Sequence, residues 1–140
     1  MDIVRAIVAV VLGAVIGSVV NMALVVAGPL VIPPPPGADM KTAEGLAAAM
    51  PLLTARHFVF PFLAHALGTF AGALVAYLVA GGRRAIPSWV VGVLFLAGGI
   101  AAAFMIPAPA AFIALDLVGA YLPMAWLAIR LGSRIAAPKA

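Results

Sequence analysis

Long apolar runs separated by short polar segments form the main pattern along this chain. The runs cover residues 3–27, 57–80, 87–105 and 110–130. Each approaches the length of about 20 residues that an α-helix needs to cross a hydrocarbon core of about 30 Å. The pattern predicts an all-α integral membrane protein with four transmembrane helices in an antiparallel bundle. Together the runs and their connections form a single domain over residues 1–140.

The first connection, residues 28–56, differs from the others in length and composition. Gly28 and Pro29 are expected to end the first helix, and a run of four prolines then favours a stiff extended spacer. Asp39 is a candidate N-cap for a short helix over residues 40–50. This helix is expected either to lie at the membrane surface as a lid or to serve as a solvated connector, and the pattern leaves both readings open.

Prolines also interrupt two of the predicted spans. Pro61 in the second span and Pro123 in the fourth have no N–H to bond the carbonyl four residues earlier, which belongs to His57 or Gly119 respectively. Within a membrane such helix breaks are tolerated where they are buried in protein or line a cavity. Helix breaks are therefore expected at Pro61 and around Gly119 and Pro123.

Three polar side chains from three different runs fall at one predicted depth. Asn21, His65 and Asp116 each lie six to nine residues inside their spans from the same surface, which corresponds to about 9 to 14 Å. An ionisable side chain inside a membrane segment is costly and indicates a functional site. We expect these three residues to line an outward-facing polar site, with Tyr121 and His57 as further ligand- or ion-binding residues.

The residue types at this site fit the binding or translocation of a small solute, a cation or a proton. A buried hydrogen-bonded triad that only fixes the register of the helices is the structural alternative. Soft thioethers combined with imidazole suit copper(I), so a metal site is a second alternative. Its candidate ligands are His57, His65, Met22 and Met105.

Two further classes have less support from the sequence. A membrane enzyme would use His65 as a base oriented by Asp116, but no motif marks a nucleophile. A structural or assembly subunit is suggested by the spacing of Gly13 and Gly17, which lets another helix approach closely. The small size and these glycine faces favour a homo-oligomer in the lipid bilayer.

The composition agrees with a membrane protein and excludes several other classes. Apolar residues make up 66% of the chain and charged residues 9%, and the mean hydropathy of +1.27 lies outside the range of soluble domains. Cysteine is absent, which excludes disulfides and cysteine-based metal sites. The net charge of +4 comes from basic residues dispersed at span ends, so nucleic acid is excluded as a partner. The sequence identifies no cofactor.

The distribution of basic residues predicts the orientation. The side that holds both termini and the connection between the second and third spans carries most of them: Arg5, Arg83, Arg84, Arg130, Arg134 and Lys139. The other side carries only Lys41 and Arg56. An excess of Lys and Arg marks cytoplasmic segments, so both termini are expected in the cytoplasm and the long first loop outside the cell membrane. The first run is longer than the apolar region of a signal peptide and is expected to remain as a span.

Overall fold

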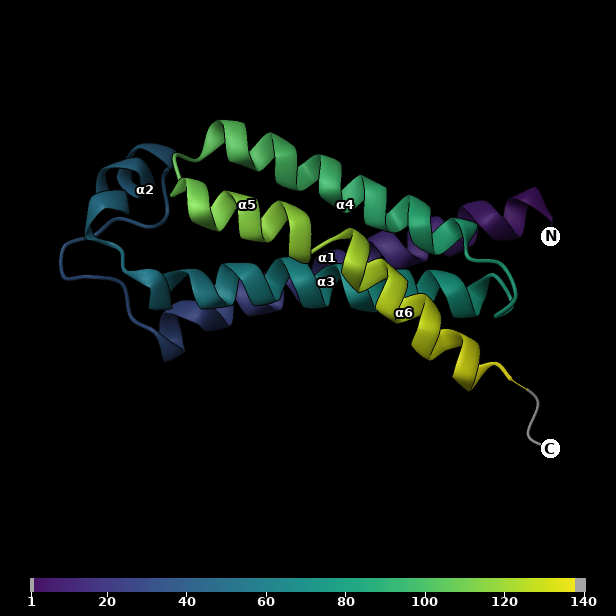
Figure 1. Ribbon diagram of the computed structural model, residues 1–140. Coiled ribbons are helices and arrows are strands. Elements are labelled where there is room, and N and C mark those ends of the chain that lie inside the picture. Colours follow the sequence, from purple (N-terminus) through teal and green to yellow (C-terminus); the bar gives the residue numbers. More distant parts are fainter. Residues whose placement is uncertain (1, 138–140) are drawn as a thin grey trace.

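The computed structural model describes residues 2–137, and in that range its helices are joined by loops with no strand (Figure 1). This confirms the predicted all-helical class. The helices are α1 (Ile3–Val31), α2 (Ala43–Ala49), two 3₁₀ helices (Met50–Leu52 and Ala55–Phe58), α3 (Val59–Val79), α4 (Ile86–Met105), α5 (Ala110–Gly119) and α6 (Leu122–Ile135). Four helical stretches are long and apolar enough to cross a membrane: Ile3–Val31, Ala55–Val79, Ile86–Met105 and Ala110–Ile135.

The helix α3 is the centre of the fold, because it packs against α1, α4 and α6. Glycines bring α1 and α3 together. An added Cβ at Gly13 would lie 2.5 Å from the carbonyl oxygen of Gly72, and one at Gly17 would lie 2.7 Å from that of Gly68. The two backbones are therefore too close for any side chain at these positions. The glycine face that suggested a homo-oligomer is occupied by a helix of the same chain.

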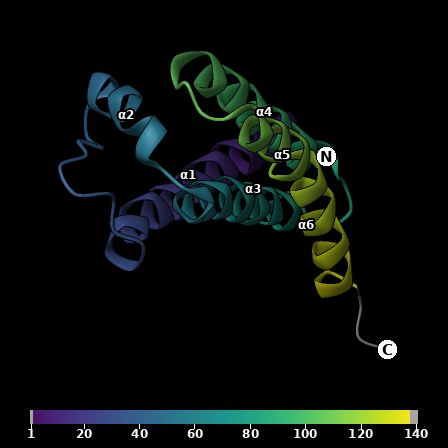
Figure 2. The ribbon, with the colours of Figure 1, turned by 60° about the vertical axis from the view of Figure 1, so that its left-hand side comes forward.

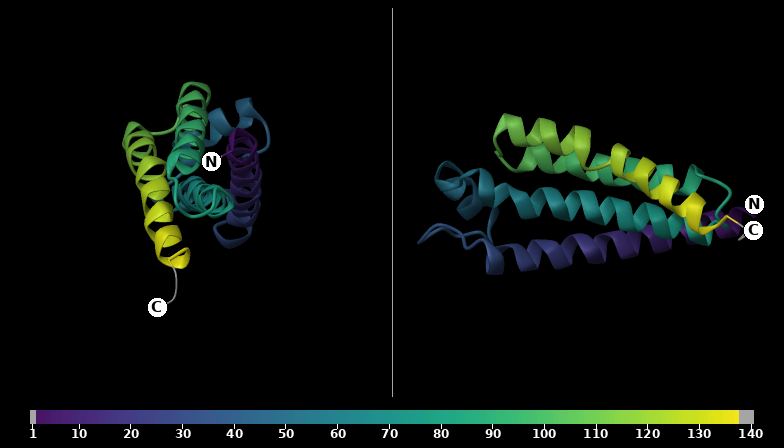
Figure 3. Two further views of the ribbon diagram at one scale, coloured as in Figure 1. Left: turned by 90° about the vertical axis from the view of Figure 1, so that its right-hand side faces the viewer. Right: turned by 60° about the horizontal axis from the view of Figure 1, so that its bottom comes forward.

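The two ends of the molecule differ in what they hold (Figures 1 and 3). One end carries the N-terminus, the end of α6 and the α3–α4 connection. The other carries α2, its flanking loops and the α4–α5 connection. At the first end, Nε of Arg5 donates to the carbonyl oxygen of Val79 at 2.7 Å and ties the start of α1 to the end of α3. Lys139, which the sequence assigns to this end, lies outside the described residues.

Two helix boundaries differ from those that the prolines and glycines suggested. α1 continues through Gly28 and Pro29 to Val31. Proline is tolerated in this last turn because it deprives only one carbonyl of a partner. Gly28 serves packing instead, since an added Cβ there would meet the side chain of Phe60 at 2.8 Å. Pro61 is the third residue of α3, so its missing N–H is one that a helix start leaves unpaired in any case, and no mid-helix break forms.

The loop helix α2 is capped by Thr42 rather than by Asp39. The Thr42 hydroxyl oxygen accepts a hydrogen bond from the Gly45 N–H at 3.0 Å. The same hydroxyl donates to the Asp39 carboxylate at 2.6 Å. The Lys41 N–H donates to that carboxylate at 2.8 Å. Asp39 thus orients the cap from outside the helix. Figures 2 and 3 show α2 lying between the ends of α1 and α4.

These hydrogen bonds make the order of α2 sensitive to acid. The hydroxyl of Thr42, and then the N–H of Lys41, hold the pKa of the Asp39 carboxyl below its usual value of 3.8. A group whose pKa is lowered on folding stabilises the folded state above its unfolded pKa and loses that effect as the pH falls through its folded pKa. We expect amide exchange protection of residues 43–49 to stay constant from neutral pH to about pH 4 and to fall below it. Protection that is low at every pH in Asp39→Ala would assign the effect to this carboxylate.

Candidate functional site

A break in the fourth span brings Tyr121 to Asp116. α5 ends at Gly119 and α6 begins at Leu122, with Pro123 in its first turn. Tyr121 has φ −118° and ψ −81°, outside the helical region. Residues five apart on a continuous helix point about 140° away from each other. The break removes this separation, so the Tyr121 hydroxyl reaches Asp116 and donates to its Oδ2 at 2.9 Å.

Asp116 is the centre of a hydrogen-bonded cluster between α3 and α5. Nδ1 of His65 lies 2.8 Å from Oδ1 and 2.9 Å from Oδ2 of Asp116. The Asp116 side chain is 6% exposed and that of His65 is 27% exposed. The rings of His65 and Tyr121 also stack, with centroids 5.8 Å apart. The hydroxyl of Thr69 donates to the backbone carbonyl of His65 at 2.7 Å and fixes this turn of α3.

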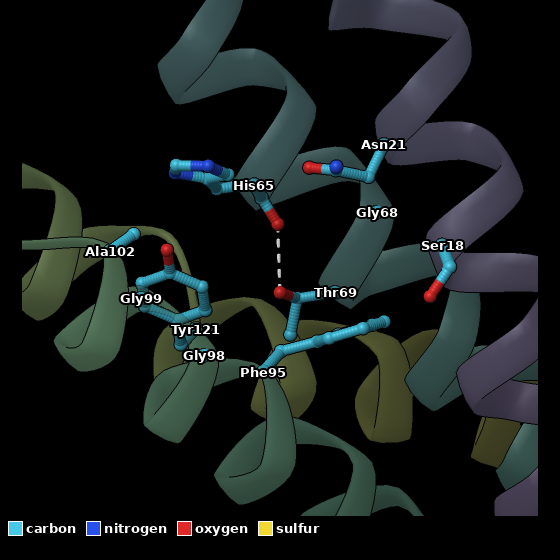
Figure 4. Close-up of a pocket in the computed structure, with 10 residues that line it drawn as sticks. All are labelled: Ser18, Asn21, His65, Gly68, Thr69, Phe95, Gly98, Gly99, Ala102 and Tyr121. Atoms are coloured by element: carbon cyan, nitrogen blue, oxygen red, sulfur yellow. Dashed lines mark hydrogen bonds between the residues drawn. The ribbon is translucent and has the colours of Figure 1, made fainter. Parts of the chain in front are cut away.

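His65 and Tyr121 lie on the wall of a cavity of about 220 Å³, which we call the polar cavity (Figure 4). Its lining comes from α1, α3, α4 and the break in the fourth span. The residues are Ser18, Asn21, His65, Gly68, Thr69, Phe95, Gly98, Gly99, Ala102 and Tyr121. In Figure 4 the amide of Asn21 points toward His65 across the top of this space. The three residues predicted to share one depth therefore lie in or directly beside one cavity.

Asn21 enters the site without a hydrogen bond to Asp116 or to His65. Its Cβ would lie 3.0 Å from a Cβ added at Gly68, so the close approach of α1 and α3 sets its position. Within the described part of the chain, neither the Asn21 amide nor the Ser18 hydroxyl makes a side-chain hydrogen bond. Ser18 and Asn21 are three residues apart on one face of α1, and both line the cavity. The cavity wall therefore contains unpaired polar atoms.

A second cavity of about 350 Å³ lies between the polar cavity and the loop, and we call it the vestibule. Its lining is mainly apolar and comes from the ends of α1, α3, α4 and α5 and from the loop that contains α2. Leu46, Met40 and Met50 form part of the loop side, and Asp116 lies on its wall. The two cavities adjoin, because both are lined by His65, Gly99 and Ala102.

The remaining predicted site residues lie apart from the cluster. Nδ1 of His57 accepts a hydrogen bond from the Thr54 N–H at 2.9 Å, which makes His57 a capping residue at the entry to α3. Its side chain also lines the vestibule. Met22 and Met105 are 58% and 78% exposed and line neither cavity. For the residues that the structure describes, no group of three His, Asp or Glu side chains forms a metal site.

In the third span the sequence interpretation named one candidate, Met105 as an alternative metal ligand, and assigned no residue to the polar site. In the structure α4 supplies Phe95, Gly98, Gly99 and Ala102 to the polar cavity. None of these side chains is ionisable, so the polar residues inside the predicted spans gave no indication of them. Their glycines were the available signal. An added Cβ at Gly99 would collide with the Tyr121 ring, which shows that Tyr121 reaches its place only because α4 has no side chain there.

The cluster defines which nitrogen of His65 can meet a ligand. The carboxylate of Asp116 accepts hydrogen bonds, so Nδ1 of His65 carries a hydrogen and donates it. In the neutral ring, Nε2 then keeps its lone pair as an acceptor. The arrangement is thus a histidine with a fixed tautomer beside unpaired amide and hydroxyl groups, in a cavity large enough for a small molecule. In comparisons with known proteins, no family model, no curated protein and no solved structure matches the chain.

Proposed function

We propose that this chain is an integral membrane protein that binds or translocates a small polar solute at the polar cavity. The observation that carries the proposal is the His65–Asp116–Tyr121 cluster, with contacts of 2.8 to 2.9 Å. Its His65 and Tyr121 lie on the wall of a cavity that also holds unpaired polar groups. A buried carboxylate inside an apolar helix costs about 2.5 to 3.5 kcal/mol on insertion scales. Recognition of a ligand by the cluster would explain why the chain retains a carboxylate at this cost.

The membrane arrangement that we propose is an antiparallel four-helix bundle with both termini in the cytoplasm. The outer face of α1 supports it, because large apolar side chains such as Val11, Val15 and Val19 are 52% to 60% exposed and need a lipid environment. Basic residues at the end with the termini support the orientation. There the guanidinium of Arg130 lies 4.8 Å from the ring centroid of Trp126, a pairing suited to a membrane interface. The cell membrane is the proposed location.

In this arrangement α2 and its flanking loops cover the outer end of the site. Loop side chains, including Leu46 and Met50, line the vestibule, and the vestibule adjoins the polar cavity at His65. A solute from outside would pass beneath α2 before it reaches His65. The loop helix is therefore proposed as the lid of the site.

Native mass spectrometry of the gently solubilised protein, combined with elemental analysis, tests the proposed function. We expect a small molecule in stoichiometric amount on the unmodified chain and its loss from Asn21→Leu, which removes polar atoms from the cavity wall at similar volume. Met22→Leu is the matched control, because Met22 is exposed and lines neither cavity. An unmodified protein with no bound molecule counts against the proposal, and a stoichiometric transition metal retained by all three proteins would replace it with a metal site.

Labelling of single cysteines tests the proposed orientation, and the cysteine-free chain needs no background mutations. In intact cells, Lys41→Cys in the loop is expected to react with a membrane-impermeant maleimide. Ala137→Cys, at the opposite end and also exposed, is expected to react only after lysis. The reverse pattern would invert the orientation, and equal reaction of both in intact cells would contradict a spanning bundle.

A further inference from the structure

We propose, building on the proposed function, that the polar cavity and the vestibule hold one uncharged amphipathic ligand. Its polar head would occupy the polar cavity and its apolar part would lie in the vestibule under α2. The proposal starts from the junction of the two cavities. His65, Gly99 and Ala102 line both cavities, so one molecule can extend from the polar cavity into the vestibule.

The chemistry of the two linings changes at this junction. On the polar side, Ser18 and Asn21 offer a hydroxyl and an amide that have no hydrogen-bond partner among residues 2–137, and Nε2 of His65 is also unpaired. Together they provide donors and acceptors for a head with several hydroxyl or amide groups. On the vestibule side, the lining is mainly apolar side chains, including Phe60, Ile113 and Leu117. A ligand that matches both linings has a polar end and an apolar end.

The absence of a free charge on either wall favours an uncharged head. No Lys or Arg lines either cavity within the described residues, so an anion would lack a counter-charge. Both oxygens of the Asp116 carboxylate already accept hydrogen bonds from His65 or Tyr121. A cation would have to displace these donors. A buried charge without a partner is costly, so a neutral hydrogen-bonding head fits best.

The loop supplies an apolar cover for the other end of the ligand. Leu46, Met40 and Met50 line the vestibule from the loop side. Methionine is flexible and adapts to apolar ligands of different shape. The α2 segment thus places apolar side chains inward, over the same space that the apolar part of the ligand would fill, while Ala47 and Ala48 are exposed.

The test uses 1-O-alkylglycerols with alkyl chains of two to ten carbons and the full chain in lipid nanodiscs. Binding is measured by equilibrium dialysis against the free aqueous concentration, with empty nanodiscs subtracted. We expect the affinity to rise about fourfold for each added methylene until the vestibule is filled. Alkyltrimethylammonium ions of equal chain length are expected to bind more weakly, and tighter binding of these cations would overturn the neutral head.

Two pairs of variants separate the head site from the vestibule. Ala103→Leu places bulk in the vestibule next to Ala102 and is expected to abolish the dependence on chain length. The ethyl compound is expected to bind still, because Ala103 does not line the polar cavity. Ala101→Leu, at an exposed position of the same helix, is the control. Leu46→Asn is expected to reduce the chain-length dependence from the loop side, with Ala47→Asn as the exposed control, so the test does not depend on one variant folding.

The outcomes distinguish this inference from the proposed function. If the ethyl compound binds and Asn21→Leu abolishes its binding, but longer chains bind no better, the polar site stands and the amphipathic ligand is overturned. A chain-length dependence that survives in both Ala103→Leu and Leu46→Asn would also overturn it, because the apolar part would then lie elsewhere. If no member of the series binds above empty nanodiscs, the inference fails for this ligand class, and the mass spectrum then decides on the polar site.

Discussion

Asp116→Asn is expected to move the ring hydrogen of His65 from Nδ1 to Nε2. The carboxylate accepts from both the His65 Nδ1–H and the Tyr121 hydroxyl, whereas an amide has only one acceptor oxygen. If that oxygen still accepts the hydrogen bond from the Tyr121 hydroxyl, the amide NH₂ faces Nδ1 of His65. Nδ1 must then accept a hydrogen bond from this NH₂. The atom of His65 that meets a ligand changes from an acceptor to a donor. An unsatisfied buried group costs about 1 to 3 kcal/mol, so we expect ligand affinity to fall roughly tenfold or more.

¹⁵N NMR of the labelled histidine side chains measures this change directly. The chain has two histidines, and His57 is an internal reference. Its Nδ1 accepts from the Thr54 N–H, so its neutral ring already carries the hydrogen on Nε2. Tyr121→Phe is the matched control, because it removes one donor to the carboxylate and leaves the Nδ1 hydrogen of His65 in place. An unchanged His65 tautomer in Asp116→Asn would contradict the assigned role of Asp116.

Gly72→Ala and Gly98→Ala are expected to change stability in opposite directions, although the chemical change is the same. A Cβ at Gly72 would lie 2.6 Å from the carbonyl oxygen of Gly13, so α1 and α3 would have to move apart. Overpacking of this kind costs about 1 to 3 kcal/mol. A Cβ at Gly98 meets nothing within 4 Å. Replacing this helical glycine is expected to stabilise the protein by about 0.5 to 1 kcal/mol.

Reversible unfolding of both variants in the same detergent or bilayer mixture tests this pair of effects. The free energy of unfolding of the unmodified protein should fall between the two values. Gly68→Ala, whose Cβ would lie 2.9 Å from the carbonyl oxygen of Gly17, is expected to follow Gly72→Ala. Equal effects at Gly72 and Gly98 would show that the α1–α3 contact is not the close interface described above.

The four long apolar helices could be predicted because their signal is local. A helix in lipid must satisfy its own backbone and present apolar side chains, so run length and composition suffice to locate it. The common depth of His65 and Asp116 followed from the same rule, since a rise of 1.5 Å per residue applies however the helices pack. The break near Pro123 was also predicted from the missing N–H. The predicted end of α1 at Gly28 and Pro29 was wrong, because the structure accommodates both residues in a last helical turn that packs against α3.

The site itself depended on how each helix is turned about its axis. Depth does not fix rotation, and only packing placed His65 within 2.8 Å of Asp116. The hydrogen bond from Tyr121 requires both the break and the space above Gly99 of α4, two features that lie far apart in the sequence. Met22 and Met105 also show that depth does not fix rotation. Their predicted depth was compatible with a site, but the rotation of their helices leaves both side chains exposed.

The sequence by itself determined the helical class, the four long apolar segments and the level at which polar residues enter them, because each follows from properties of a single helix. The tertiary structure decided which side chains meet, which cavities adjoin and which nitrogen of His65 faces a ligand. These depend on contacts between helices, and such contacts are set by the close approach at Gly13, Gly17, Gly68 and Gly72. That approach is a property of pairs of helices, which no single apolar run specifies.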